Sequence, residues 1–134
     1  RVSSIYEDHE GILWIGTNGG GLVRLRNDTF TTYTTRTGLS DNRISAIAED
    51  PDGNLWIGTY GGGLNRLENG KFTAYTTKEG LSDDFVLSLC LDPEGSLWIG
   101  TGGGGLNRLK ESGEISGPLA FALITRDGFQ SLSP

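Results

Sequence analysis

Short runs in which apolar and polar residues alternate make up this chain of 134 residues. Alternation with a period of two is typical of strands that bury one face. The runs are rich in Ile, Leu, Thr and aromatic residues, which suit a half-buried pleated surface, and no segment keeps a helical period over a useful length. The pattern therefore predicts an all-β protein of short strands joined by tight turns.

The pattern repeats every 42 residues. Trp14, Trp56 and Trp98 lie at this spacing, and each belongs to a Leu-Trp-Ile-Gly-Thr segment. An Asp-x-x-Gly turn precedes each segment, and a glycine triplet followed by Leu-x-Arg-Leu comes after it. The glycine triplets occupy residues 19–21, 61–63 and 103–105. Three copies in one register do not arise from composition, so the chain consists of three copies of one structural unit.

Each copy is expected to hold four strands. The Leu-Trp-Ile-Gly-Thr and Leu-x-Arg-Leu segments are the second and third strands. The first strands are predicted at Val2–Glu7, Ile44–Glu49 and Val86–Leu91. The fourth strands are predicted at Phe30–Thr35, Phe72–Thr77 and Leu119–Thr125. An insertion around Ser112–Leu119 is expected to delay the last of these and to make the outer strand of the third copy irregular.

A repeat of this length with four strands is a β-propeller blade. We therefore expect three four-stranded antiparallel blades, at residues 1–42, 43–84 and 85–134. Propellers typically close with about four or more blades. Three blades are thus either part of a longer propeller or a ring that closes by oligomerisation, and two copies would give six blades.

A family resemblance rests on residues 50–64, which read Asp-Pro-Asp-Gly-Asn-Leu-Trp-Ile-Gly-Thr-Tyr-Gly-Gly-Gly-Leu. This stretch resembles the two-component regulator propeller repeat, and residues 38–42 and 80–84 resemble the usual lead into the next repeat. The resemblance covers the chain to about Leu109. It implies a periplasmic or extracellular sensor region of a bacterial signalling protein, often a histidine kinase and often responsive to carbohydrates. Such regions carry more than three blades.

Charge and hydropathy exclude several partners. Eleven basic residues are scattered among seventeen acidic ones, for a net charge of −6, which argues against a nucleic-acid partner. The longest apolar run, residues 118–124, is too short to span a bilayer, so we expect no membrane contact by this segment. The chain begins at Arg1 without a visible signal peptide, and we expect it to be a piece of a longer protein.

Candidate binding residues follow from strand alternation. The glycine triplets and the Gly-Leu-Ser-Asp connectors should share one end of the blades, and the Asp-x-x-Gly turns should lie at the other. By analogy with the fold class, the glycine end is expected to bind ligand. Residues that vary there within the constant frame are the candidates, and they are Arg1, Asn18, Arg36, Arg43, Tyr60, Lys78 and Phe85. Tyr and Arg can stack on and hydrogen-bond a sugar or peptide, although a solvated rim of loops has the same composition.

Other repeated or singular residues have structural interpretations. Arg24, Arg66 and Arg108 are expected to hold each blade to the next through a carboxylate or carbonyl. His9 occupies a turn, and Cys90, in an inner strand, is expected to be a buried thiol with no disulfide partner. No metal site is expected, because the Asp-x-x-Gly turns offer too few oxygens for calcium. No cofactor is expected either, because no helix follows the glycine triplets.

The sequence favours a non-enzymatic ligand-sensing module. An enzyme needs a convergent acid, base or nucleophile, whereas the glycine end offers Tyr60 and scattered Asp but no His, so no catalytic residue is assigned. A propeller lyase is the weaker alternative. A structural scaffold that docks a protein, further blades or a second copy is scarcely separated from the sensing hypothesis by sequence alone.

Overall fold

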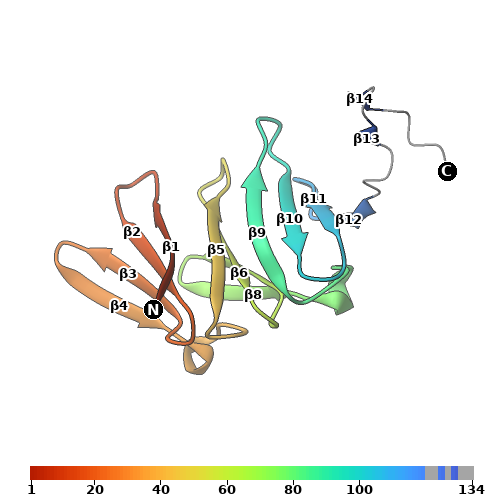
Figure 1. Cartoon of the computed structure of the whole chain (residues 1–134). Coiled ribbons are helices and arrows are strands. Elements are labelled where there is room, and N and C mark those ends of the chain that lie inside the picture. The colour runs from red at the N-terminus through yellow and green to blue at the C-terminus, as the bar shows by residue number, and fades with distance from the viewer. Residues whose placement is uncertain (120–123, 126–127, 130–134) are drawn as a thin grey trace.

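A computed structural model describes residues 1–119, 124–125 and 128–129. It contains three four-stranded antiparallel sheets, none closed on itself, arranged as successive blades along an open arc (Figure 1). Blade 1 has β1 (Val2–Glu7), β2 (Leu13–Thr17), β3 (Leu22–Arg26) and β4 (Thr29–Tyr33). Blade 2 has β5 (Ile44–Glu49), β6 (Leu55–Thr59), β7 (Leu64–Glu68) and β8 (Lys71–Tyr75). Blade 3 has β9 (Val86–Leu91), β10 (Leu97–Thr101), β11 (Leu106–Leu109) and β12 (Ile115–Leu119).

The predicted fold class is confirmed. Strand order within each sheet follows the sequence, and the first strands β1, β5 and β9 lie side by side along the arc (Figure 1). The helical elements among the described residues are two short 3-10 turns, Thr35–Thr37 and Thr77–Glu79, which follow β4 and β8. In that part of the chain no helix has the length and apolar character needed to cross a membrane.

The predicted fourth strand of the third blade is wrong. Residues assigned to an insertion form β12 instead, because the turn between β11 and β12 is only one residue longer than its counterpart. Leu67 pairs with Phe72 in blade 2, and Leu109 pairs with Ile115 in blade 3. Of the predicted strand Leu119–Thr125, residues 120–123 lie outside the described part. Its last two residues form β13 (Ile124–Thr125), which pairs with β14 (Gly128–Phe129) in a separate sheet.

The hydrophobic core lies between adjacent blades. Trp14 and Leu22 of blade 1 pack with Ile44 and Ile57 of blade 2, and a second cluster joins blades 2 and 3 in the same way. The glycine of the Leu-Trp-Ile-Gly-Thr segment permits this approach, because a Cβ on Gly16 would lie 2.6 Å from Ile44 Cγ2. The glycine therefore makes room for the next blade.

Hydrogen bonds from repeated side chains fix the turns and connectors. The Trp Nε1–H groups donate to Asp8, Asp50 and Asp92 at 2.8, 2.9 and 2.8 Å. Asn65 is fully buried in β7, donates to Ser40 Oγ at 2.6 Å and accepts from Ser40 N–H at 3.2 Å. Asn107 and Ser82 repeat this arrangement in the next blade. Each blade thus anchors the connector that leads into it.

The predictions for the repeated arginines and for Cys90 are wrong. Arg66 Nη2 lies 3.6 Å from Glu68 Oε1 of its own blade. Arg24 and Arg108 lie over the Trp ring of their own blade, 6.0 and 5.3 Å from its centroid, so they do not join blades. Cys90 is exposed, whereas Ala48 at the same repeat position is buried. Ala48 is covered by blade 3, while Cys90 lies on the face of β9 that points away from blade 2.

Candidate functional site

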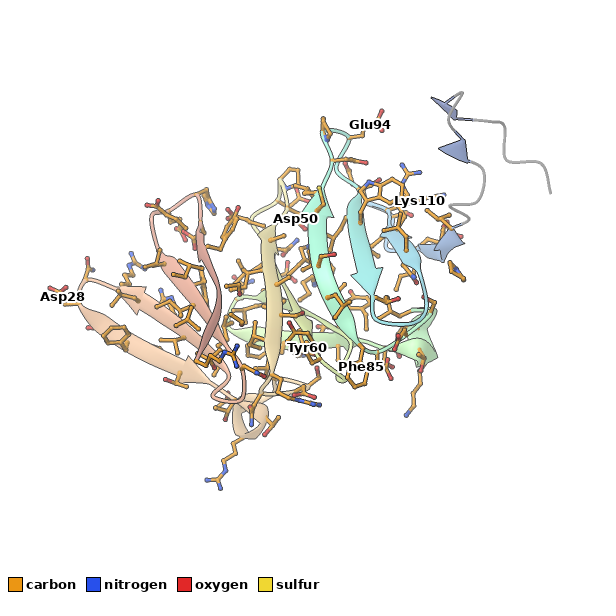
Figure 2. The ribbon with its side chains drawn as sticks, in the orientation of Figure 1. Asp28, Asp50, Tyr60, Phe85, Glu94 and Lys110 are labelled. Atoms are coloured by element: carbon orange, nitrogen blue, oxygen red, sulfur yellow. The ribbon has the colours of Figure 1, made fainter. Side chains whose placement is uncertain are left out.

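The glycine triplets and connectors meet at one end of the blades, as predicted. Gly21 N–H donates to Asn42 C=O, and Gly63 N–H donates to Asp84 C=O, both at 2.9 Å. Each bond ties the triplet of one blade to the connector entering the next. In Figure 2, Tyr60 and Phe85 lie at this end, and Asp50 and Glu94 lie at the opposite end.

Five predicted binding residues form one row at the inner edge of this end. Asn18 N–H donates to Arg1 C=O at 2.9 Å within blade 1, and Tyr60 N–H donates to Arg43 C=O at 3.0 Å within blade 2. Isolated β-bridges then join Asn18 to Arg43 and Tyr60 to Phe85 across the blade boundaries. We call Arg1, Asn18, Arg43, Tyr60 and Phe85 the inner row. Because main-chain bonds hold the row, its side chains can vary without loss of the fold.

Arg43 and Asp41 form a bidentate ion pair beside the inner row. Arg43 Nε lies 3.1 Å from Asp41 Oδ1, and Arg43 Nη2 lies 2.9 Å from Asp41 Oδ2. The hydrogen bond from the guanidinium holds the pKa of Asp41 below its usual value, and the same bond raises the pKa of Arg43. Asp41 therefore stays ionised at neutral pH and balances the charge of Arg43, which makes the pair a locally neutral, planar surface.

Phe85 and Arg43 flank the main chain of Gly61. A Cβ at Gly61 would lie 2.9 Å from Arg43 Nη2 and 3.6 Å from Phe85 Cε1, and its φ of +119° favours glycine. Phe85 is 47% exposed. An exposed aromatic ring and a guanidinium therefore lie beside a peptide without a side chain, and such groups can stack on and hydrogen-bond a flat, polar ligand.

Arg36 and Lys78 lie apart from the inner row. They belong to the 3-10 turns that follow β4 and β8, the outermost strands of blades 1 and 2. Thr34 and Thr76 cap these turns, and both basic side chains are in exposed residues. The structure thus gathers five of the predicted residues and leaves two at the outer rim, and binding by any of them stays a prediction.

Two acidic residues at this end were not among the predicted site residues. Asp41 holds Arg43, and Asp83 at the same repeat position accepts from Phe85 N–H at 3.0 Å and Gly103 N–H at 2.6 Å. These backbone hydrogen bonds hold the pKa of Asp83 below its usual value. The sequence signal for them is the Ser-Asp pair that recurs 42 residues apart in the two connectors, at residues 40–41 and 82–83.

Chemistry at the glycine end is limited among the described residues. His9 lies at the opposite end, where its ring contacts the Glu49 carboxylate. In the described part of the chain, no group of three or more His, Cys, Asp or Glu side chains is placed to hold a metal ion. The inner row can therefore stack and hydrogen-bond, but it presents no general base paired with a nucleophile.

Comparison with protein families gives a specific match. The model described as "Two component regulator propeller" matches residues 1–19, 38–61 and 80–103. No curated protein matches the chain in sequence.

Solved structures share the fold. The extracellular domain of a hybrid two-component system from B. thetaiotaomicron is 29% identical, with a TM-score of 0.74 over 87% of this chain. A second such domain from the same organism is 24% identical, with a TM-score of 0.79 over 96% of this chain. The chain spans only 18% of the length of each domain. Virginiamycin B lyase from Staphylococcus aureus is 21% identical over 86% of this chain and 40% of its own length, with a TM-score of 0.69.

Proposed function

Because the chain belongs to the two-component regulator propeller family, we propose that it is a ligand-sensing segment of a bacterial signalling protein and is not an enzyme. Similar solved structures are extracellular domains of two-component systems. The proposal includes a location in the periplasm or outside the cell, which these similar structures support. The ligand in this proposal is a carbohydrate or another small polar compound that binds at the glycine end.

The inner row is the observation that carries this proposal. Its main chain repeats the same hydrogen bonds from blade to blade, while its side chains change from Asn18 to Tyr60 and from Arg43 to Phe85. The main-chain hydrogen bonds repeat from blade to blade, while the side chains at equivalent positions differ. Such an arrangement allows the side chains to suit one ligand without a change of the fold. Residues needed only for the fold repeat in every blade, as the Trp and its Asp partner do.

We propose no enzymatic activity because of the side chains that the inner row contains. Among the described residues of this row there is no His, and the nearby Asp41 is held by Arg43 with a lowered pKa, which makes it a weak base. The likeness to virginiamycin B lyase, at 21% identity, extends to the fold alone.

The test is a ligand screen by thermal shift, with mono- and disaccharides and short peptides as probes. A binding compound should raise Tm by mass action. Tyr60→Asn, which installs the residue of blade 1, should remove most of the shift while the main-chain bond to Arg43 remains. Glu94→Gln at the opposite end (Figure 2) is the matched control and should leave the shift unchanged. A shift that survives both Tyr60→Asn and Arg43→Gln contradicts the proposal.

A scaffold is the second candidate, and a specific observation favours it. The outer face of blade 1 exposes Ile5 and Phe30. Their counterparts in the repeat, Ile47 and Phe72, are partly buried and pack against the core between blades 1 and 2. We propose that a further blade, or a second copy of the chain, covers this face. A screen without any hit, together with association of the chain, would favour the scaffold over the sensor.

A further inference from the structure

A cavity of about 180 Å³ lies between blades 2 and 3, at the end that carries the Asp-x-x-Gly turns. Asp50 and Lys110 line this cavity, and in Figure 2 both lie toward the opposite end of the blades from Tyr60 and Phe85. The cavity shares no residue with the inner row. It is therefore a separate candidate site, at the junction of these two blades.

The junction of blades 1 and 2 shows what occupies the same place one blade earlier. His9 belongs to the turn of blade 1, and its ring contacts the Glu49 carboxylate of blade 2. The ring also lies over the turn of blade 2, because a Cβ on Gly53 would lie 3.3 Å from His9 Cε1. Ile12 is 4% exposed and packs in the core cluster with Leu55. A basic ring and an aliphatic side chain thus occupy the first junction at this end.

The second junction lacks both of these side chains. By the 42-residue repeat, the counterparts of His9, Ile12 and Glu49 are Pro51, Asn54 and Leu91, and all three counterparts line the cavity. Pro51 has a shorter side chain than His9 and no donor for a carboxylate. The Asn54 amide donates to Asp50 Oδ2 at 3.1 Å, within its own turn. The cavity is therefore the place that a basic ring occupies between blades 1 and 2.

Two basic residues line the cavity, and both already have acidic partners. Glu68 Oε1 lies 3.6 Å from Arg66 Nη2, and Glu114 Oε1 lies 3.9 Å from Lys110 Nζ. Neither Glu68 nor Glu114 is a lining residue. Carboxylates outside the cavity thus offset the charge of both lining bases, so these bases oppose a cationic ligand only weakly.

Two carboxylates at the cavity have no basic partner. Asp52 and Glu111 line it, are exposed, and form no ion pair with a described residue. The Glu111 carboxylate lies over the turn of blade 3, because a Cβ on Gly95 would collide with it. Gly95 is the counterpart of Gly53, over which the His9 ring lies. A carboxylate is therefore placed beside the cavity, where it can pair with a cation.

Another part of the lining is apolar. Pro51, Leu91 and Tyr75 line the cavity, and each of them is exposed or half-buried. Transfer of such surface from water to contact with an apolar group is favourable. A bare ammonium ion would leave this surface uncovered, whereas a ring that carries the charge would cover it. The lining thus favours a cation with an apolar body.

We propose that this cavity binds a small organic monocation, in which an ammonium or imidazolium group is joined to a single ring. The ring takes the place that the His9 side chain has at the first junction, and the charge lies beside Glu111 and Asp52. The volume is below the roughly 300–1,000 Å³ of sites for drug-sized ligands, which limits the ligand to one ring. The site is distinct from the inner row and goes beyond the function proposed for that row.

Benzylamine tests this site by NMR, with the Trp indole N–H signals as the readout. Among Trp14, Trp56 and Trp98, only Trp56 lines the cavity. Benzylamine should move the Trp56 signal in a saturable way and leave that of Trp14 in place. Benzyl alcohol, which has the same shape without the charge, should bind at least about threefold more weakly, and benzoate should not bind. Added NaCl should weaken the binding of benzylamine.

Variants separate the space in the cavity from its charge. Asn54→Ile installs the residue of blade 1 and should abolish the Trp56 response without loss of the fold. Glu111→Gln should weaken the binding of benzylamine by about threefold or more and leave that of benzyl alcohol unchanged. Asp28→Asn, which removes a carboxylate from the corresponding turn of blade 1 (Figure 2), is the matched control and should leave binding unchanged.

Three results would overturn the proposal: no saturable movement of the Trp56 signal, binding of benzyl alcohol or benzoate as tight as that of benzylamine, or a response that survives both Asn54→Ile and Glu111→Gln. A ligand at the inner row would instead depend on Tyr60 and would be unaffected by Glu111→Gln. The two proposals can therefore fail separately.

Discussion

At the scale of single residues, the repeated aspartate is worth more to the fold than its place in a turn suggests. Asp50 accepts hydrogen bonds from Asp52 N–H, Asn54 N–H, Asn54 Nδ2 and Trp56 Nε1, at 2.9 to 3.1 Å. Asp50→Asn would point an amide N–H at one or more of these donors. We expect the free energy of unfolding to fall by about 1–3 kcal/mol, measured by urea denaturation. Asp52→Asn, an exposed neighbour, is the control, and equal effects of the two variants would refute the assignment.

His9 makes the junction of blades 1 and 2 sensitive to pH. Hydrogen bonding to Glu49 raises the pKa of His9 above its usual value, and its own N–H donates to Glu49 Oε1 at 3.0 Å. Because the pKa of His9 is higher in the folded chain than in the unfolded chain, its protonation stabilises the fold below the pKa of the unfolded chain. This stabilisation is lost as pH rises through the pKa of the folded chain. Relative to His9→Gln, which keeps the backbone bond, the Tm of the natural chain should fall slightly as pH rises above about 6.5. Parallel Tm profiles for the two proteins would contradict this.

Residue roles were predictable from the sequence where they depend on the repeat alone. The constant Trp, Asp and Gly were assigned to the scaffold, and the structure gives each a packing or hydrogen-bonding role. The partner of a given side chain was not predictable. Arg24 lies opposite Trp14 on the neighbouring strand, so the ring of its own blade is within reach before any carboxylate of the next one. Strand register, which the sequence does not state, decides between the two.

At the scale of elements, the approach of neighbouring blades depends on one glycine in each second strand. A Cβ on Gly58 would lie 2.6 Å from Val86 Cγ1 and 2.9 Å from Ser45 Oγ. Gly58→Ala should therefore push β9 away and cost about 1–3 kcal/mol of stability, as overpacked cores do. Urea denaturation of the two variants Gly58→Ala and Gly100→Ala measures this. Gly100 faces only Ser88 among the described residues, and that side chain can rotate, so an equal loss in both variants would refute the explanation.

Most strands could be predicted because three aligned copies average out local ambiguity. The first strands have the predicted bounds in all three blades. The prediction failed at β12. The Phe that marks this strand in the first two copies is replaced by Ile115 in the third, so the other copies do not help to locate it. The position of the inner row follows from the alternation of strands, but the ion pair between Arg43 and Asp41 does not. It depends on the rotamers of the two side chains, which the sequence pattern does not specify.

At the scale of the whole molecule, the two ends of the arc are unlike and complementary. Val2, Ile5 and Phe30 on blade 1 are 59%, 62% and 65% exposed. Their counterparts in blade 2 are Ile44, Ile47 and Phe72, which lie in or against the core between blades 1 and 2. Blade 1 covers them with the face that carries Trp14, which we call its Trp-bearing face. Blade 3 carries a third Trp-bearing face, with Trp98 and the exposed Cys90, at the other end of the arc. A contact between these two faces repeats the packing already present between blades 1 and 2.

When the 134-residue segment is produced by itself, two copies should therefore associate head to tail. Because each copy offers one face of each kind, two such contacts close a ring of six blades, within the usual range of four to eight. Light scattering after size exclusion should give twice the 14.3 kDa of one chain, with dissociation on dilution. Ile5→Lys combined with Phe30→Lys should yield a folded monomer, since burial of either ammonium group is costly. Phe85→Lys, an exposed aromatic of the inner row, is the matched control and should stay dimeric. A natural chain that remains a monomer at every concentration, or a Phe85→Lys variant that dissociates equally, would show that these two faces do not meet.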